Sequence, residues 1–423
     1  MKKILLILIV IILGNSCSFS YAENASTDDL DIFGEGAILI DEETGQILYE
    51  KNANKQLYPA STTKIMTGIL AIELGDLNEK VTITDDVIEG LDGTHIALEP
   101  GEELTLNDLV HALLIGSAND AAVAIAIHIS GSVEEFVKLM NEKAEKIGAL
   151  NTHFENPNGL PNDEHMTTAY DLSLIAKYAM KNKTFRDIVK NYYYIIPTTN
   201  KKDESRYLQS SNRLLYSQKK IDLNGETIPI KYDGVDGVKS GYTSVAQNCL
   251  VTSAKKGNTR LISVVLKSQG RNIYIDTHKL LNYGFNNFDK NFLTSKNEFI
   301  GNVKIKNGTN KFITGVSEDD FYVYVPKDNS SEVKTNISLP SKLEAPISKG
   351  QALGKIEYFL DGNSLGYVNI VSTENVEAMP LYRQIIENYP IGKWWLSLII
   401  LFVFWRMILH IKKTKRRKRK SFI

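Results

Sequence analysis

The chain has 423 residues, of which 43% are hydrophobic and 23% charged, with 28 Gly and 11 Pro. This composition excludes disordered, collagen-like and disulfide-scaffold classes, and the length allows two or three domains with sizeable cores. The net charge of −1 hides a segregation, because eleven basic residues lie in the two ends, where no acid occurs. The remaining 38 basic residues face 50 acidic ones, so residues 23–393 carry about −12. A body this acidic lacks the positive surface that nucleic-acid binding needs, so no nucleic-acid partner is expected.

Residues 1–22 have the pattern of a secretory signal peptide. Two lysines precede an apolar run over residues 4–13, and small residues at the positions that a signal peptidase reads predict cleavage after Ala22. The alternatives are an uncleaved anchor and a lipoprotein modified at Cys17, which the preceding residues suit poorly. After cleavage only Cys249 remains, which excludes an intrachain disulfide and a thiolate metal site.

In chain order, the hydrophobic periodicity of the body predicts two regions. The expected elements of the first region are a hairpin over 35–51, helices over 61–74, 107–115, 120–129 and 133–147, strands over 247–254 and 260–267, and a helix over 276–283. Strands at both sequence ends of a helical middle predict an α/β sandwich over residues 31–290, whose sheet is completed by distant segments.

The second region is expected to be a small all-β domain over residues 295–378. Its short alternating segments are bounded by Gly, Asn, Asp and Pro, and they lie at 302–308, 321–327, 333–340, 354–360 and 366–372. Residues 379–393 are interpreted as a stalk that leads from this domain to the C-terminal apolar segment.

Residues 394–411 are apolar almost throughout, and their number is close to the roughly 20 residues that cross a bilayer. The basic cluster that follows, over 412–423, belongs in the cytoplasm by the positive-inside rule. A helix lying on the membrane surface is the alternative, but the run over 396–405 has Ser397 as its one polar residue. We therefore predict a single transmembrane helix, a short cytoplasmic tail, and an acidic body on the extracytoplasmic face of the cell membrane.

A Ser-x-x-Lys motif opens the expected helix over 61–74. Residues three apart share a helix face, so the Lys64 amine can reach the Ser61 hydroxyl. The first helical turn also supplies backbone N–H groups and the positive end of the helix dipole. Together these features can activate a hydroxyl, provided that Lys64 is partly neutral. Taken alone, the motif is as well explained by Ser61 acting as an N-cap.

Two further motifs are short and polar. Ser117 and Asn119 lie in the break between two expected helices, where both side chains can point into a cleft; a capped helix start is the plainer alternative. The run Lys239-Ser240-Gly241, followed by Tyr242 and Thr243, precedes a strand and can line a cleft edge. Its hydroxyls and ammonium could hold a carboxylate, and Gly241 leaves room for a ligand backbone. A polar strand end is the plainer alternative for this run.

The order and spacing of the three motifs are more informative than any one of them. Ser117 follows Ser61 by 56 residues, and Lys239 follows it by 178. Serine-x-x-lysine, serine-x-asparagine and lysine-serine-glycine in this order form the set described for penicillin-binding proteins and class A β-lactamases.

Further segments narrow the resemblance. NPNGLP at 156–161 and HMTTAYD at 165–171 are similar to segments of the serine-type D-alanyl-D-alanine carboxypeptidases, and residues 345–358 resemble the close of that family's small β domain. Over residues 31–375 the chain is identified as a member of this family of low-molecular-mass penicillin-binding proteins. The resemblance implies an α/β fold of the β-lactamase/transpeptidase type, a sandwich of antiparallel sheet and helices, followed by the all-β domain and the transmembrane helix.

The resemblance also implies roles for the catalytic residues. Ser61 would attack the carbonyl between the two terminal D-alanines of a peptidoglycan stem peptide, with Lys64 as the base. Ser117 would relay the proton to the departing D-alanine, and water would hydrolyse the acyl-enzyme. β-Lactam antibiotics would act as covalent inhibitors, and no metal or organic cofactor is needed.

Substrate binding is implied for the remaining motif residues. Asn119 would hydrogen-bond the substrate backbone, and Lys239, Ser240 and Thr243 would hold its terminal carboxylate beside Gly241. The backbone N–H groups of Ser61 and Tyr242 would form the oxyanion hole. Arg271 is a further candidate for charge near the carboxylate.

Two alternative functions share this fold: a β-lactamase and a non-catalytic wall-binding protein. The three motifs are intact, which argues against a loss of activity. Class A β-lactamases use a glutamate to drive water onto the acyl-enzyme, but the matching position here is His153. Glu155 is the nearby candidate for that role. We therefore predict D-alanine release from peptides but a stable adduct with benzylpenicillin.

Overall fold

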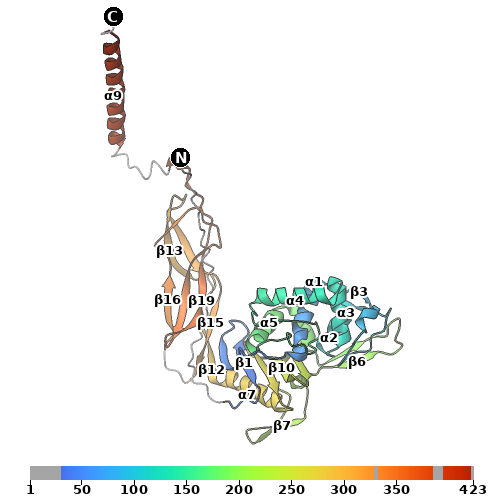
Figure 1. The fold of residues 1–423 in the computed structure, drawn as a ribbon. Coiled ribbons are helices and arrows are strands. Elements are labelled where there is room, and N and C mark those ends of the chain that lie inside the picture. The colour runs from blue at the N-terminus through green and yellow to red at the C-terminus, as the bar shows by residue number, and fades with distance from the viewer. Residues whose placement is uncertain (1–29, 328–331, 384–393, 421–423) are drawn as a thin grey trace. The chain divides into compact units, whose positions relative to one another are not determined.

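The computed structural model describes residues 30–327, 332–383 and 394–420 (Figure 1). The predicted signal peptide over 1–22 lies outside the described residues, as do 384–393 of the predicted stalk and the last three residues of the tail. The described residues form two compact units that divide at Asp289, with residues 326–327 also belonging to the first unit.

A five-stranded antiparallel sheet forms the centre of the first unit, in the order β2-β1-β11-β10-β9. The N-terminal hairpin therefore pairs with strands from the far end of the unit, as the sequence predicted. All six residues of β1 are buried, because both faces of the sheet are covered. The strands are β1 (Gly36–Asp41), β2 (Ile47–Lys51), β9 (Val235–Thr243), β10 (Gln247–Lys256) and β11 (Thr259–Ser268).

Helices cover the two faces of this sheet, with α5 and α7 on opposite sides of β1 and β10 in Figure 1. Ile38 and Ile40 pack into the large apolar cluster that the helices of the middle region build. Leu39 points the other way, towards Gly284 of α7, as the period of two along a strand requires. The helices are η1 (Ala60–Thr63), α1 (Lys64–Leu74), α2 (Leu106–Leu114), α3 (Asn119–Ser130), α4 (Val133–Ile147), α5 (Ala169–Lys181), α6 (Lys183–Val189) and α7 (Asn272–Asn287).

The helix predicted over 61–74 differs at its start, where one 3₁₀ turn, η1, precedes α1. Short hairpins and turns complete the unit. They are β3 (Lys80–Thr82) with β4 (Glu103–Thr105), β5 (Tyr193–Ile196) with β6 (Arg206–Gln209), β7 (Lys220–Leu223) with β8 (Glu226–Pro229), η2 (Asp85–Val87) and η3 (Arg213–Leu215).

The part of the second unit before residue 379 is built from strands, which confirms the predicted C-terminal β domain. A six-stranded sheet has the order β16-β18-β19-β14-β13-β17, and β12 pairs with β15. Alternate apolar residues such as Val303, Ile313 and Ile370 are buried. The strands are β12 (Phe288–Thr294), β13 (Phe299–Lys306), β14 (Phe312–Ser317), β15 (Phe321–Pro326), β16 (Lys334–Ser338), β17 (Lys342–Glu344), β18 (Ala352–Leu360) and β19 (Asn363–Ser372).

A single long helix, α9 (Trp394–Lys420), contains the predicted membrane span. Its stretch over 395–415 is long and apolar enough to cross a membrane by length and composition. The helix continues beyond residue 411, where the predicted span ends, because the Lys and Arg residues that follow are good helix formers.

Candidate active site

The Ser61–Lys64 pair lies where η1 passes into α1. Lys64 Nζ lies 3.0 Å from Ser61 Oγ. Lys64 is fully buried, whereas Ser61 is partly exposed and reachable from solvent. Ala60, directly before the serine, has a left-handed backbone with φ of 50°, a conformation that a residue with a side chain adopts at an energetic cost. The helical spacing therefore brings the two side chains together as predicted.

The Lys64 amine has two further partners, Asn119 Oδ1 at 2.7 Å and the Asn158 carbonyl at 2.5 Å. Burial holds the pKa of Lys64 well below its usual range, the nearby Lys239 charge lowers this pKa further, and Asp120 acts in the opposite direction. Both oxygen partners can only accept hydrogen bonds. A neutral amine therefore gives its two N–H bonds to Asn119 and Asn158 and directs its lone pair at the Ser61 hydroxyl.

The loop between α2 and α3 brings Ser117 and Asn119 to the same place. Ser117 has a left-handed backbone with φ of 59°, and its Oγ accepts a hydrogen bond from Lys239 Nζ at 2.9 Å. Asn119 Nδ2 donates to the Asp92 carbonyl at 2.6 Å, which fixes the orientation of the amide. One N–H of that amide is left for a ligand.

Lys239 on β9 is the second buried cation of the cluster. Besides Ser117, its amine donates to the Ser240 carbonyl at 2.8 Å and to Ser211 Oγ at 3.5 Å. Burial lowers the pKa of Lys239 to about 7. Ser240 Oγ donates to Ser211 Oγ at 2.7 Å. Two hydroxyls thus lie beside one ammonium, a suitable arrangement for a carboxylate.

Gly241 lets β9 approach the catalytic serine closely. A Cβ atom on Gly241 would come within 2.6 Å of the Ser61 backbone nitrogen. Tyr242 follows with its ring exposed, and Thr243 Oγ1 accepts a hydrogen bond from the Ala246 N–H at 3.0 Å. The backbone of β9 therefore lies directly against the predicted oxyanion-hole donor of Ser61.

Two family models match most of the chain. The sequence model described as D-alanyl-D-alanine carboxypeptidase, peptidase family S11, matches residues 22–270, and the model for the C-terminal domain of penicillin-binding protein 5 matches residues 288–378. The chain belongs to the D-alanyl-D-alanine carboxypeptidase family. The family membership and fold that the sequence predicted are thus confirmed.

Individual relatives match this chain along most of their own length. D-alanyl-D-alanine carboxypeptidase DacF of Bacillus subtilis is 36% identical over 390 residues, which cover 89% of this chain and 95% of that protein. DacD of Escherichia coli is 29% identical over 413 residues, covering 92% and 99%. The structure of penicillin-binding protein 5 from Haemophilus influenzae is similar with a TM-score of 0.69 and 30% identity, covering 82% of this chain and 98% of that one.

Several groups that support this candidate site were not predicted as site residues from the sequence. Ser211 lies in a loop without a recognisable pattern, so no signal could have found it. Asn158 contributes a backbone carbonyl, which leaves no trace in side-chain identity. For the loop around Asn158, the glycine at position 159 was the available signal in the sequence. Its φ is 87°, and a Cβ there would come within 1.9 Å of the Ala60 carbonyl oxygen, so the position requires glycine. The glycine therefore lets the Asn158 loop pack against η1.

His165 connects this loop to the catalytic turn. Its Nδ1 accepts a hydrogen bond from the Glu155 N–H at 3.0 Å, so its proton lies on Nε2, which is 2.9 Å from Thr63 Oγ1. Burial, followed by the charges of His153 and Lys64, lowers the pKa of His165 to about 4. We infer that His165 is a neutral positioning residue for the start of α1.

Two other expected groups form no hydrogen bond or ion pair with the Ser61, Lys64 and Lys239 side chains within the described residues. The Glu155 carboxylate is bonded to His153 Nε2 at 2.8 Å. Arg271 is an exposed residue at the N-cap of α7. Within residues 30–327, 332–383 and 394–420, no group of three or more His, Cys, Asp or Glu side chains is placed to hold a metal ion.

Proposed function

We propose that the chain removes the terminal D-alanine from peptidoglycan stem peptides through an acyl-enzyme on Ser61. The observation that carries this proposal is the buried Lys64 amine, which lies 3.0 Å from Ser61 Oγ and has two acceptor oxygens as its other partners. A base held in this way can take the serine proton without a histidine. The chemistry needs only groups of the chain itself.

In acylation, Ser61 Oγ bonds to the carbonyl carbon of the penultimate D-alanine while Lys64 takes the hydroxyl proton. The negative oxygen of the tetrahedral intermediate lies against the N–H groups of Ser61 and Tyr242, and losing one such donor typically costs about 10²–10³ in rate. The carbon–nitrogen bond then breaks. The proton returns through the Ser117 hydroxyl to the nitrogen of the departing D-alanine.

The terminal carboxylate of the substrate is assigned to the ammonium and hydroxyls of Lys239, Ser240 and Ser211. Their mutual distances of 2.7 and 3.5 Å suit the two oxygens of a carboxylate. Thr243 Oγ1 accepts a hydrogen bond from the Ala246 N–H of its own turn, and the Thr243 hydroxyl proton remains for a substrate acceptor.

A water molecule then attacks the ester, which releases the shortened stem peptide and restores Ser61.

β-Lactams are expected to acylate the same serine. Membrane attachment through α9 is supported by the length and apolarity of its residues 395–415. We propose that the body faces outward, because the basic tail follows the span directly and is retained in the cytoplasm.

The test is mass analysis of the full-length protein in detergent with a pentapeptide that ends in D-Ala-D-Ala. Release of one D-alanine is expected, with no release from the matched peptide that ends in L-Ala. The Ser61→Ala variant should release none and should fail to bind a fluorescent penicillin, whereas Ser244→Ala, an exposed serine beyond β9, should behave as the parent. Covalent labelling of Ser61→Ala would place the nucleophile elsewhere.

A further inference from the structure

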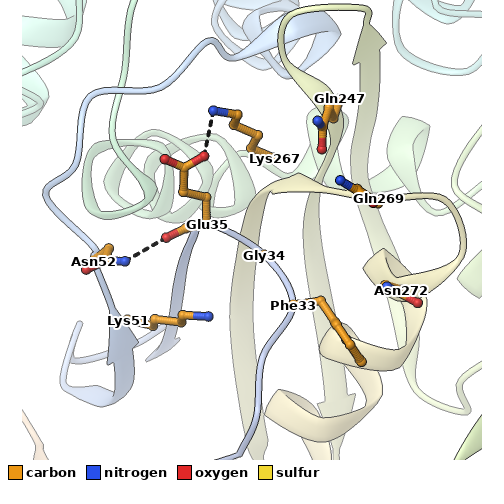
Figure 2. A pocket seen from close by; sticks show the side chains of 9 residues that line it. All are labelled: Phe33, Gly34, Glu35, Lys51, Asn52, Gln247, Lys267, Gln269 and Asn272. Carbon is orange, nitrogen blue, oxygen red and sulfur yellow. Dashed lines mark hydrogen bonds and ion pairs between the residues drawn. The ribbon is translucent and has the colours of Figure 1, made fainter.

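A pocket of about 450 Å³ lies in the first unit, and the predicted site residues are not among those that line it (Figure 2). This volume lies within the usual range for small-molecule sites. Its polar lining includes the lysines Lys51 and Lys267 and carboxamides at positions 52, 247, 269 and 272, and the half-exposed ring of Phe33 also contributes. We call it the carboxamide pocket.

The carboxamide pocket lies at the end of the sheet where the catalytic strand also ends. β9 ends at Thr243, which is paired with Gln247 at the start of β10. The next strand, β11, ends close to Lys267, and β1 begins beside it at Gly36. Adjacent strands are about 4.8 Å apart. The pocket therefore begins about 5–10 Å from the last residue of β9.

The direction of the bound substrate leads towards this pocket, a step that rests on the proposed function. The terminal carboxylate is assigned to Lys239 and Ser240, and the reacting carbonyl to the N–H of Tyr242, further along β9. The remaining stem peptide must then leave past Thr243. Four extended residues span about 13 Å, so the carboxamide pocket lies within reach of the sugar that carries the stem peptide.

The chemistry of the pocket suits such a sugar. The side chains of Gln247, Gln269 and Asn272 have no hydrogen-bond partner among the described residues, although each faces the pocket. A carboxamide both donates and accepts, which matches the hydroxyl and N-acetyl groups of an amino sugar. Glu35, the carboxylate of the pocket lining, is already paired with Lys55 and Lys267. The lining therefore presents no unpaired carboxylate.

Several residues around the pocket have a left-handed backbone conformation, as residues of the Ser61 cluster do. Asn52, Gln247 and Lys267 have left-handed φ values of 47°, 54° and 53°. Lys267 lies in the register shift between β10 and β11, and such bulges redirect side chains near functional sites. Backbone strain of this kind gathers at binding and catalytic sites.

We propose that the carboxamide pocket binds the N-acetylated muramyl sugar of the peptidoglycan substrate while its stem peptide occupies the Ser61 cluster. The pocket would thereby distinguish glycan-linked stem peptides from free ones. Gln269 and Asn272 would contribute to this selectivity without touching the reacting atoms.

Kinetics with two substrates test the proposal in the full-length protein. N-acetylmuramyl-pentapeptide should have a KM about tenfold lower than the free pentapeptide, equivalent to one or two good hydrogen bonds. The double variant Gln269→Ala with Asn272→Ala should lose this preference and keep the parent kcat and KM for the free peptide. Asn258→Ala, an exposed carboxamide at the opposite end of β10 and β11, is the matched control and should retain the preference.

Equal KM values for the two substrates in the parent protein, or an equal loss for both in the double variant, would overturn the proposal. A binding measurement separates this result from a failure of the proposed function. Muramyl dipeptide lacks D-Ala-D-Ala, and it should bind protein already acylated by benzylpenicillin but not the acylated double variant. If muramyl dipeptide binds the acylated protein but the unacylated parent releases no D-alanine from the pentapeptide, only the carboxypeptidase step is refuted. If muramyl dipeptide does not bind, the sugar site is refuted.

Discussion

At the scale of single residues, the site depends on two buried lysines with different tasks. Lys64 must be neutral to take a proton, and burial together with the nearby Lys239 charge lowers its pKa. Lys239 must be charged to attract a carboxylate, and its three oxygen partners favour the ammonium. Because the two positive charges repel each other, the favoured state has one lysine protonated and the other neutral.

The rate of acylation should therefore have a bell-shaped pH dependence. Because the pKa of Lys64 is lowered, its neutral form accumulates as pH rises, and acylation rises with it. Because the pKa of Lys239 is about 7, its charge is lost as pH rises further, and acylation falls. The measurement is the second-order rate constant for a fluorescent penicillin across this range. Lys239→Arg keeps a permanent charge and should remove the falling limb; a parent rate that still climbs above pH 9 would contradict the assignment.

The penicillin adduct on Ser61 should be stable, because no carboxylate forms a hydrogen bond or ion pair with Ser61 or Lys64 within the described residues. The carboxylate of Glu155, the one nearby candidate, is bonded to His153. Glu155→Gln should therefore leave the adduct lifetime unchanged, as followed by intact mass after rapid mixing with benzylpenicillin. Adducts that clear within milliseconds, with turnover that Glu155→Gln abolishes, would favour a β-lactamase.

At the scale of elements, the sequence predicted those parts that follow from local periodicity. The first hairpin, the helices α1 to α4 and the strands β10 and β11 have strong patterns and were predicted, whereas α5 and α6 were not. The three motifs supplied the residues that the structure brings together around Lys64 and Lys239. The start of α1 was predicted less well, because the 3₁₀ turn around Ser61 is imposed by β9 and the Asn158 loop. Ser211 and the Asn158 carbonyl enter the site through tertiary packing, which local patterns do not encode.

Gly159 provides a test of this packing. Gly159→Ala should lower stability and slow acylation, because its Cβ would displace the Ala60 carbonyl and with it the Asn158 carbonyl that holds Lys64. Gly131→Ala is the matched control, since its φ of 84° is similar but no atom lies within 4 Å of the added Cβ. The control should cost about 1 kcal/mol of unfolding free energy and leave acylation unchanged. Thermal unfolding and penicillin labelling measure the two effects; equal behaviour of the variants would show that the contact is not needed.

At the scale of the whole molecule, charge and apolarity are unevenly distributed along the chain. The body is acidic, whereas eight basic residues gather between positions 412 and 420. The apolar side chains of α9 are exposed along residues 395–411, and an apolar surface of this extent is unfavourable in water. A bilayer around α9, as proposed above, would remove this cost and would leave the basic residues at one membrane face, where the membrane potential and lipid charge would hold them.

The orientation of the chain should follow from this division. A tag placed after Ile423 should survive protease added to intact cells stripped of their wall, because the basic tail is expected inside. A tag inserted at Gly362, in the exposed turn between β18 and β19, should be digested under the same conditions. Both tags should be digested once detergent opens the membrane, which shows that each is cleavable. Loss of the C-terminal tag with survival of the Gly362 tag in intact cells would reverse the topology, and the body would then have no access to the cell wall.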